Sequence, residues 1–399
     1  MLRPAFLASV VVLAAACGAP SGSPDGGAAD AGLDAGFDAG PGDAGTDAGV
    51  DAGVPTTRLT VTYPAGTHSV FVRGSLPPLD WNSGIPMQKV DATTWTVSLT
   101  GLSASQRLEW KPLLDDATWS KGPNYAVAGA GAQTVAPRFY RDTGEWTVRW
   151  QFHSTVLNND RGVYVYLPPT YLENSTARMP VVYMHDGQNL FDPAASFGGV
   201  TWRVPETMDA AAGDGRFREA IIVGPENAGA ARIDEYTPTL DTSVGQGGKG
   251  DLYLRMLIEE LKPKVDAELR TLPGPADTVI IGSSLGGLIS SYAGVHHGGV
   301  FGCIGAMSPS TWWDNRYILT VVPQTSAPRP LRVYVDSGDS GPSNDDVTNT
   351  ADLAAAYRAL GYADGSTLKY VVQAGATHTE SAWASRLPGA FEFLLGPRL

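Results

Sequence analysis

The sequence predicts an α/β protein in which a mostly parallel sheet flanked by helices follows a small all-β sandwich and a disordered N-terminal tether. From Trp150 onward, strand-like runs alternate with helical patterns. Between Arg58 and about Phe139, short runs of alternating apolar and polar residues are broken by Gly and Pro. Before them, the chain is low in complexity. We therefore divide the 399 residues into four parts, 1–17, 18–56, 57–143 and 144–399.

Composition excludes two broad classes of protein. Hydrophobic residues make up 43% of the chain and charged residues 17%, so the whole chain is not disordered. The net charge of −13 argues against a nucleic-acid binder, which would carry a basic patch. Seven Asp and no Lys or Arg lie between Gly18 and Pro55, so over half of the excess charge belongs to one segment.

The first 17 residues predict an export signal. Arg3 precedes an apolar stretch, Ala5–Ala16, which is too short to span a bilayer. Leu13-Ala14-Ala15-Ala16-Cys17 resembles a bacterial lipoprotein box, which implies lipidation of Cys17 and anchoring at the outer membrane or cell surface. The alternative is cleavage after Ala16, giving a secreted or periplasmic protein. Cys303, the other cysteine, lies in an apolar run and is expected to be a small buried hydrophobe.

Residues 18–56 predict a solvated tether. Small residues and charges of one sign cannot bury enough surface to offset the entropy of ordering. A calcium-binding repeat is the alternative, but it needs turns with convergent oxygens. The Asp-Ala-Gly repeat begins at Asp30, Asp34, Asp38, Asp43, Asp47 and Asp51.

The segment 57–143 predicts a β-sandwich. Its half-buried strands are expected at 59–63, 70–72, 95–99 and 108–110. The run from Phe71 to Ser75, followed by Leu79-Asp80-Trp81, resembles the start of starch- and glycogen-binding modules. By this resemblance, the counterparts of the residues that bind sugar in those modules would be Trp110, Lys111, Trp119 and Asn124. The alternative is that these tryptophans form the core, or that the module only packs on its neighbour.

The segment 144–399 predicts the α/β domain. Apolar residues recur at helical spacing between Asp251 and Arg270, which predicts a helix there. Several of the predicted strands are continuous apolar runs, as in a sheet that is buried on both faces. These strands are expected at 163–167, 181–184, 220–223, 278–281, 331–335 and 368–372.

A nucleophilic serine is predicted at Ser284. Gly282-Ser283-Ser284-Leu285-Gly286 follows a predicted strand and opens a helix, which is the setting of a nucleophile elbow. Side chains two residues to either side would collide with the strained turn, which explains the two glycines. A phosphate-binding loop is the alternative, but it would require Lys and Ser or Thr after the glycines.

The base and the acid should follow Ser284 in the order acid, then His. His296 and His297 lie on the helix that Ser284 begins and should point away from the elbow, which leaves His378 as the base. The acid should follow the strand near Val335. We favour Asp345, with Asp346 and then Asp339 as alternatives, because the loop after Gly338 is long.

The segment His185–Phe191 completes a set of motifs that resembles the esterase D and enterochelin esterase-like group of α/β-hydrolases. The other motifs are Arg232–Tyr236, the Ser284 elbow and the His378 segment, and the resemblance extends from about Val163 to Leu395. It implies an α/β-hydrolase fold and an oxyanion hole formed by the backbone amides of Gln188 and Leu285.

The same resemblance leaves three residues with open roles. Arg232 and Glu235 are expected to line the substrate pocket, or to form an internal ion pair that anchors their loop. His185 is expected to order the oxyanion loop, since a zinc site would lack further ligands.

Together these features predict a surface-tethered serine esterase that uses Ser284, His378 and Asp345 and needs neither metal nor cofactor. The expected substrate is a small-molecule or polysaccharide-linked ester, and the sandwich is expected to bind carbohydrate as a further partner. We expect the protein to contact the membrane only through its lipid and to bind no nucleic acid. Two alternatives use the same sequence features. One is an acyltransferase with the same triad, and the other is a non-catalytic glycan-binding lipoprotein.

Overall fold

The computed structural model describes residues 55–397. The predicted signal, Cys17 and nearly all of the predicted tether lie outside this range. Within it, no helix is long and apolar enough to cross a membrane. The first strand begins at Thr56, one residue before the predicted start of the sandwich.

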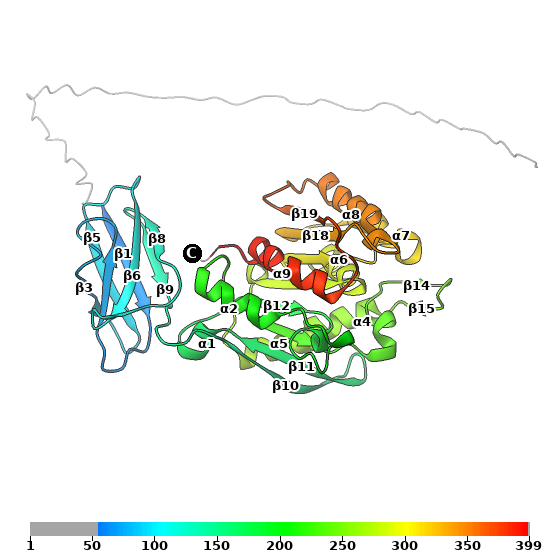
Figure 1. The fold of residues 1–399 in the computed structure, drawn as a ribbon, viewed down its shortest axis with the longest axis horizontal. Helices are drawn as coiled ribbons and strands as arrows, with labels where there is room; N and C mark the ends of the chain where they lie inside the picture. The colour runs from blue at the N-terminus through cyan, green and yellow to red at the C-terminus, as the bar shows by residue number, and fades with distance from the viewer. Residues whose placement is uncertain (1–54, 398–399) are drawn as a thin grey trace, which may run out of the picture. The chain divides into compact units, whose positions relative to one another are not determined.

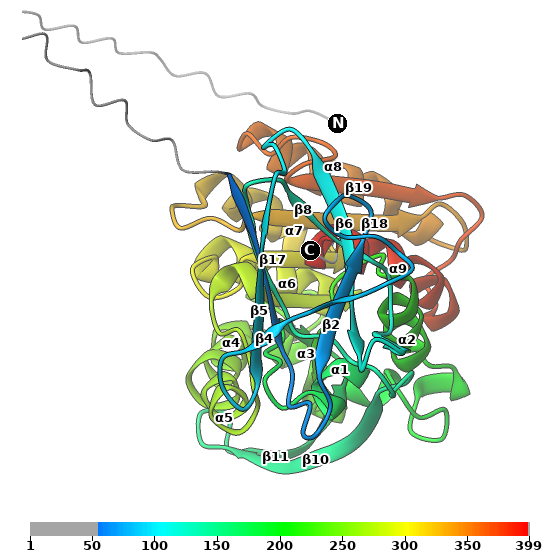
Figure 2. The same ribbon diagram turned by 90° about the vertical axis from the view of Figure 1, so that its left-hand side faces the viewer.

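Residues 56–135 form two sheets that pack face to face, and their strands can be followed in Figure 2. The first sheet has the order β4-β5-β1-β9, with β1 (Thr56–Thr62), β4 (Gln88–Lys89), β5 (Thr94–Thr100) and β9 (Ala132–Val135). The second has the order β3-β2-β6-β7 with β8 also beside β6, and contains β2 (Val70–Gly74), β3 (Ile85–Pro86), β6 (Arg107–Leu114), β7 (Thr118–Trp119) and β8 (Tyr125–Ala128). The predicted all-β domain is confirmed.

Trp110 and Lys111, two of the residues compared with those of sugar-binding modules, both make hydrogen bonds within the sandwich. Trp110 is completely buried, and its indole nitrogen donates to Gln133 at 2.8 Å. Lys111 donates to the carbonyl oxygen of Gly122. Because alternate residues of β6 face opposite sides, Trp110 lies in the sandwich core, in agreement with the alternative that this tryptophan forms the core, whereas Lys111 lies on the other side of the strand and is half-buried. Trp119, in contrast, is 38% exposed.

The α/β domain is built on an eight-stranded sheet of order β10-β11-β13-β12-β16-β17-β18-β19 (Figure 1). In that order, the six strands from β13 to β19 run parallel to one another. Strand β11 runs antiparallel to both of its neighbours, β10 and β13. Their bounds are β10 (Glu145–Ser154), β11 (Asn159–Leu167), β12 (Val181–Met184), β13 (Ile221–Pro225), β16 (Thr278–Ser283), β17 (Cys303–Met307), β18 (Arg332–Gly338) and β19 (Leu368–Gln373).

Helices cover both faces of this sheet, because successive strand residues point to opposite sides. Val181 and Tyr183 of β12 pack in one apolar cluster, and Val182 and Met184 pack in the other. The first cluster includes residues of α4 (Gly250–Arg255), the π-helical turn η4 (Met256–Leu261), α5 (Lys262–Glu268), α6 (Leu285–His297), α7 (Trp313–Val321) and α8 (Val347–Ala359). The second includes residues of α2 (Val204–Asp214) and α9 (Glu380–Leu395).

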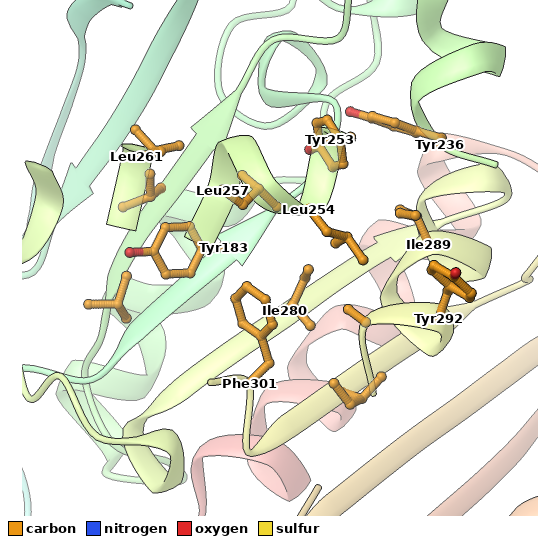
Figure 3. Packing of buried hydrophobic residues seen from close by; sticks show 14 of the residues in the cluster. Tyr183, Tyr236, Tyr253, Leu254, Leu257, Leu261, Ile280, Ile289, Tyr292 and Phe301 are labelled. Atoms are coloured by element: carbon orange, nitrogen blue, oxygen red, sulfur yellow. The ribbon is translucent and has the colours of Figure 1, made fainter. Parts of the chain in front are cut away.

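Figure 3 shows part of the first cluster, with Tyr183 and Ile280 of the sheet among Leu254, Leu257 and Phe301. The helix predicted between Asp251 and Arg270 is therefore present, and its apolar stripe packs on the sheet. It consists of α4, η4 and α5 in succession.

Buried polar contacts hold the chain that follows the sandwich. Arg138 is 1% exposed, and its guanidinium contacts Glu219 at 2.6 Å and donates to the carbonyl of Ala212 at 2.7 Å. Glu173, the last residue of α1 (Pro169–Glu173), accepts hydrogen bonds from the amides of residues 139–141 and from the Tyr63 hydroxyl. The connection between the two domains is thus fixed by side chains of the α/β domain.

The carboxyl ends of the parallel strands lie along one edge of the sheet, where the predicted site residues follow. The order of the sheet places β12 directly beside β16, so the loop after Met184 and the turn after Ser283 are neighbours. In open α/β sheets, ligands bind outside the carboxyl ends of strands where the strand order switches direction. The fold therefore positions a site at this edge.

Candidate active site

Ser284 lies at a sharp turn between β16 and α6. Its φ of 58° and ψ of −124° are unfavourable for a residue with a side chain, and such strain is typical of functional turns. A Cβ on Gly282 would lie 2.6 Å from His185 Cδ2, and one on Gly286 would lie 3.2 Å from His185 Cβ. The elbow packs directly on the His185 side chain, so Gly282 has no room for a Cβ and Gly286 has little.

His185 is a neutral support beneath the elbow. It is 2% exposed, and burial lowers its pKa to about 3. The Ser290 hydroxyl donates to the carbonyl of Gly286 at 2.8 Å, so it accepts from His185 Nε2 at 3.0 Å. His185 Nδ1 then accepts from the Tyr253 hydroxyl at 2.8 Å. This geometry leaves no ring nitrogen for a metal.

His378 and Asp345 form a close pair. His378 lies in the loop between β19 and α9, and its Nδ1 is 2.6 Å from Asp345 Oδ1. The Asp345 side chain is fully buried, whereas the His378 side chain is 39% exposed. Burial alone would raise the pKa of Asp345, but hydrogen bonds from His378, Ser308 and Gly338 outweigh it and hold the pKa below its usual value.

The other acids near His378 have different partners. Asp346 accepts from Asn349 at 2.7 Å, and burial raises its pKa. Asp339 accepts from the amide of Gly375 at 2.6 Å. Asp336 lies within β18 and pairs with Arg386 at 3.0 Å. Among the described residues, only Asp345 forms an ion pair with His378.

Ser284 and His378 line the same cavity. Within residues 55–397 no hydrogen bond joins the two side chains, and Ser284 Oγ lies 3.3 Å from Ser310 Oγ. Hydrogen bonds between nucleophile and base are often long without substrate and tighten when it binds. The structure thus brings the serine, the histidine and the acid to one edge of the sheet, with the histidine ring oriented by the acid.

The two backbone amides that the resemblance assigns to the oxyanion hole belong to Leu285, next to the nucleophile, and to Gln188, which lines the same cavity as Ser284. Leu285 is the first residue of α6, so its N–H has no acceptor within the helix. Gln188 lies in the short turn η1 (Gly187–Asn189), directly after β12 and its loop residue Asp186. A Cβ on Gly187 would lie 2.1 Å from the carbonyl oxygen of Gly224, so this turn packs tightly on β13.

Arg232 fixes the loop that carries Gln188. Its guanidinium makes two hydrogen bonds to the Asp186 carboxylate, at 2.7 and 2.8 Å, and Asn227 donates to the same carboxylate at 2.7 Å. Burial would raise the pKa of Asp186, but the Arg232 charge keeps it below its usual value. Arg232 also lines the cavity, so it combines the two roles that the sequence leaves open.

Glu235 does not line the cavity, and its expected contact with substrate is corrected. It is 2% exposed and pairs with Arg161 of β11 at 3.0 Å. The physical reason is position, because Glu235 ends the short helix α3 (Arg232–Glu235), whose last residue points into the domain. The ion pairs of this segment join Arg232 to Asp186, Asp234 to Lys249 and Glu235 to Arg161.

The cavity above Ser284 has a volume of about 520 Å³ and is open to solvent. Its walls include three residues that sequence reasoning missed, Phe197, Glu380 and Trp383. Phe197 is 77% exposed, and Trp383 packs edge-on against His378 with ring centroids 4.9 Å apart. Glu380 is two residues after His378 and begins α9. The spacing of residues in the sequence does not indicate that this helix begins at the cavity.

The sheet, the elbow at Ser284 and the loops at the carboxyl ends of the strands together define an α/β-hydrolase, as the sequence resemblance implied. Residues 154–394 match the family model described as "Putative esterase", and the chain belongs to that family. It is therefore a carboxylic ester hydrolase.

The chain is similar in sequence to a curated protein and similar in fold to solved structures. The uncharacterized protein YbbA of Bacillus subtilis (strain 168) is 28% identical over 250 residues, which is 59% of this chain and 93% of YbbA. A solved ferulic acid esterase is 21% identical with a TM-score of 0.50, and the match covers 63% of this chain and 98% of that one. The enterobactin esterase FES from Shigella flexneri is 19% identical with a TM-score of 0.50, and the match covers 82% and 87%. At these identities, the two solved structures support the fold alone.

Proposed function

We propose that this esterase cleaves its substrate through an acyl-enzyme formed on Ser284, with His378 as the base and Asp345 as the acid that orients it. The observation that carries the proposal is the 2.6 Å contact between His378 Nδ1 and Asp345 Oδ1, at a cavity that Ser284 and His378 both line. A buried carboxylate on Nδ1 leaves Nε2 unprotonated, so that Nε2 can accept the serine proton.

In the first half-reaction, Ser284 Oγ attacks the ester carbonyl carbon while His378 takes the hydroxyl proton. The carbonyl oxygen becomes an oxyanion, held by the amides of Gln188 and Leu285. Two such donors supply several kcal/mol of transition-state stabilisation. The C–O bond to the alcohol then breaks, and His378 returns the proton to the departing alcohol oxygen.

In the second half-reaction, water attacks the acyl-enzyme carbonyl and gives a proton to His378. The bond to Ser284 Oγ breaks, His378 protonates that oxygen, and the carboxylic acid leaves. An alcohol in place of water would give acyl transfer with the same residues. We propose water as the acceptor because the chain belongs to an esterase family.

The test is turnover of purified wild type and Ser284→Ala on short acyl nitrophenyl esters, feruloylated and acetylated sugars, and siderophore lactones. We expect Ser284→Ala to fold normally and to lose nearly all activity. Activity above a few per cent would reject Ser284 as the nucleophile. Adding a sugar alcohol and measuring the ratio of new ester to free acid distinguishes transfer from hydrolysis.

For the substrate, we propose a neutral small-molecule ester or the esterified side group of a polysaccharide. A cavity of this size accommodates a compact ligand. Its Arg232 charge is already paired with Asp186, and Glu380 adds a carboxylate, so an anionic substrate would meet no unpaired cation at these residues.

We further propose that the sandwich holds carbohydrate on Trp81 and Trp119. These side chains are 37% and 38% exposed, and their ring centroids lie 6.2 Å apart. Arg73, which pairs with Asp116, lies 5.3 Å from the Trp119 ring. Exposed aromatic faces of this kind suit the apolar faces of sugar rings.

Binding to insoluble starch and xylan tests this second proposal. The double variant Trp81→Ala/Trp119→Ala should lose retention on the polysaccharide, whereas Trp146→Ala, which removes a tryptophan of similar exposure (39%) from the α/β domain, should keep it. Equal retention of all three proteins would leave the sandwich with a structural role only.

For localisation, we propose export and lipidation at Cys17, so that the catalytic domain is tethered at the cell surface. The support is the lipoprotein-box resemblance and the acidic, small-residue composition of residues 18–56.

A further inference from the structure

The acid–base pair is supported by a second layer of buried polar residues that the reaction itself does not use. Asp336 lies on β18, Ser308 follows β17, and Trp383 and Arg386 lie on α9. These four side chains are at most 6% exposed. They come from three elements that meet behind Asp345, so their contacts decide how that carboxylate is held.

The hydrogen bonds of Ser308 can be assigned completely. Trp383 Nε1 lies 3.0 Å from Ser308 Oγ, and Arg386 Nη2 lies 2.9 Å from it. Both groups can only donate, so Oγ accepts twice. The single hydroxyl proton is therefore directed to Asp345 Oδ2, 2.6 Å away. No other arrangement satisfies all three neighbours.

This assignment divides the two oxygens of Asp345. Oδ2 accepts from Ser308 and from the amide of Gly338, whereas Oδ1 accepts from His378. A carboxylate fixed at one oxygen cannot rotate about its side-chain bonds, so the other oxygen stays aimed at His378. A hydrogen bond to an ionised group is stronger than one between neutral groups, which makes this restraint effective.

Ser308 is itself held at a cost in backbone strain. Its φ is +39°, in the left-handed region that a residue with a side chain rarely adopts. Its amide donates to the carbonyl oxygen of Asp336 at 2.7 Å, and Arg386 Nε lies 3.0 Å from Asp336 Oδ2. Strain that surrounding contacts maintain points to a role for the strained residue.

We propose that Ser308 is a positioning residue for the Asp345–His378 pair, set in place by Trp383 and the buried Arg386–Asp336 ion pair. The proposal rests on the function proposed above, because it requires Asp345 to be the acid. Ser308 touches neither substrate nor the reacting atoms, and it acts only through the Asp345 carboxylate.

The charged and titratable groups around Asp345 come from several elements and are retained when only Ser308 is changed. They are His378 in the loop before α9, Arg386 of α9 at 3.8 Å, Asp336 of β18, the neighbouring Asp346, and Arg316 of α7, whose charge acts on Asp346. The Ser308 hydrogen bond helps to hold the pKa of Asp345 below its usual value, so its loss raises that pKa and also frees the carboxylate to rotate. Asp345 then keeps a proton to a higher pH, and the acid limb of the pH–activity profile should move to higher pH.

The experiment compares Ser308→Ala with wild type in kcat, KM and the pH dependence of kcat/KM. We expect kcat to fall about 10- to 100-fold, the loss of a hydrogen bond to a charged group, with KM within about twofold. The acid limb should move to higher pH. A merely structural role would lower the amount of folded enzyme and leave the position of the acid limb unchanged.

A matched control tests whether the loss of any buried hydroxyl in this loop lowers kcat, and a second variant is available in case Ser308→Ala does not fold. Thr311→Val removes another buried hydroxyl of the same loop, whose hydrogen bond to Pro309 is 3.5 Å long, and should stay within about twofold of wild type. If Ser308→Ala does not fold, Ser308→Gly replaces it, because glycine adopts a positive φ without strain. Wild-type kcat in the variant that folds would overturn the proposal.

A double-mutant cycle distinguishes this proposal from the proposed function. In the Asp345→Asn background, Ser308→Ala should cause no further loss of kcat, because its effect passes through the carboxylate. An equal loss in both backgrounds would overturn the positioning role of Ser308. An active Asp345→Asn enzyme would instead overturn the assignment of the acid.

Discussion

At the scale of single residues, the chemistry depends on which carboxylate faces His378. Three acids follow Gly338 in one loop, and their side chains diverge. Asp345 points at His378, Asp346 accepts from Asn349, and Asp339 accepts from the amide of Gly375. The acid of a triad orients the imidazole and stabilises its protonated form, whereas a loop-capping carboxylate stabilises only the loop.

We expect Asp345→Asn to fold and to lose turnover by about 10⁴, the magnitude for an acid that sets the tautomer of the base. Asp346→Asn and Asp339→Asn should stay within about tenfold of wild type, since a lost loop cap costs about 1 kcal/mol of stability. Measuring kcat for the three purified variants side by side checks this. A crippled Asp339→Asn or Asp346→Asn beside an active Asp345→Asn would move the acid to that residue.

The sequence could narrow the acid to this loop but could not choose within it. The choice depends on backbone turns, because Asn344, Asp345 and Asp346 all have positive φ angles that redirect successive side chains. Glu235 shows the same limit, since the motif that contains it gives no sign that its side chain points inward to Arg161. Ser308 and Arg386 carried no signal at all, because they come from separate elements that only the fold brings together.

At the scale of elements, the elbow and the loop after β12 form one unit through His185. The ring of His185 lies against both glycines of the elbow and is bonded to Tyr253 and Ser290. This explains why burial keeps the ring neutral and lowers its pKa to about 3. A histidine in the unfolded chain takes up a proton near pH 6.5.

The sign of the pH dependence follows from these two values. Between pH 6.5 and about 3, the unfolded chain binds a proton at His185 that the folded protein does not. The free energy of unfolding therefore falls as pH falls below 6.5, by roughly 1 kcal/mol per pH unit from this group. The contribution of His185 to the free energy of unfolding is therefore full above pH 6.5 and is lost as the pH falls toward 3.

Urea unfolding at pH 7.0 and 4.5 measures the effect. His185→Gln should be less stable than wild type at pH 7.0, because it loses the bond to Tyr253, but its stability should change less between the two pH values. His153→Gln, which alters an exposed histidine, should keep the wild-type dependence. The same pH dependence in His185→Gln as in wild type would show that another group causes the acid loss.

Most elements of the α/β domain could be predicted because their patterns are local. The strand predicted at Val181–Met184 has those bounds, and five others differ by a few residues at their ends. Two strands of the eight-stranded sheet were missed, as was the short hairpin of β14 (Leu240–Asp241) and β15 (Gln246–Gly247). β17 (Cys303–Met307) contains Gly and Ala and is short, and β10 (Glu145–Ser154) is a largely exposed edge strand without a buried apolar face. Edge position and small residues both weaken the hydrophobic pattern on which strand prediction relies.

At the scale of the whole molecule, the two folded domains lie in the order that the changes in sequence pattern along the chain predict. A sandwich precedes an α/β-hydrolase, and Arg138 and Glu173 fix the chain between them. The predicted small, buried Cys303 is 2% exposed and lies in β17. The predicted strand-end location of the site also agrees with the fold, since every parallel strand from β12 to β19 delivers a residue to it or to its supporting layer.

The proposed anchoring predicts a change of location for the whole chain. Cys17→Ser removes the proposed site of lipid attachment, so the protein should move from the membrane fraction to the soluble fraction of cells that produce it. Fractionation and immunoblotting of wild type and variant measure this, with esterase activity as the control for folding. Retention of the variant in the membrane fraction would show that another part of the chain binds there.

The central claim is that Ser284 is the nucleophile of a working Ser-His-Asp triad, and labelling with a fluorophosphonate probe tests it most directly. The probe reacts covalently with an activated serine, and mass spectrometry of the digested protein identifies the labelled residue. We predict one modified residue, Ser284, with no labelling in Ser284→Ala and strongly slowed labelling in Asp345→Asn. An unlabelled wild-type protein, or a label on a different serine, would contradict it.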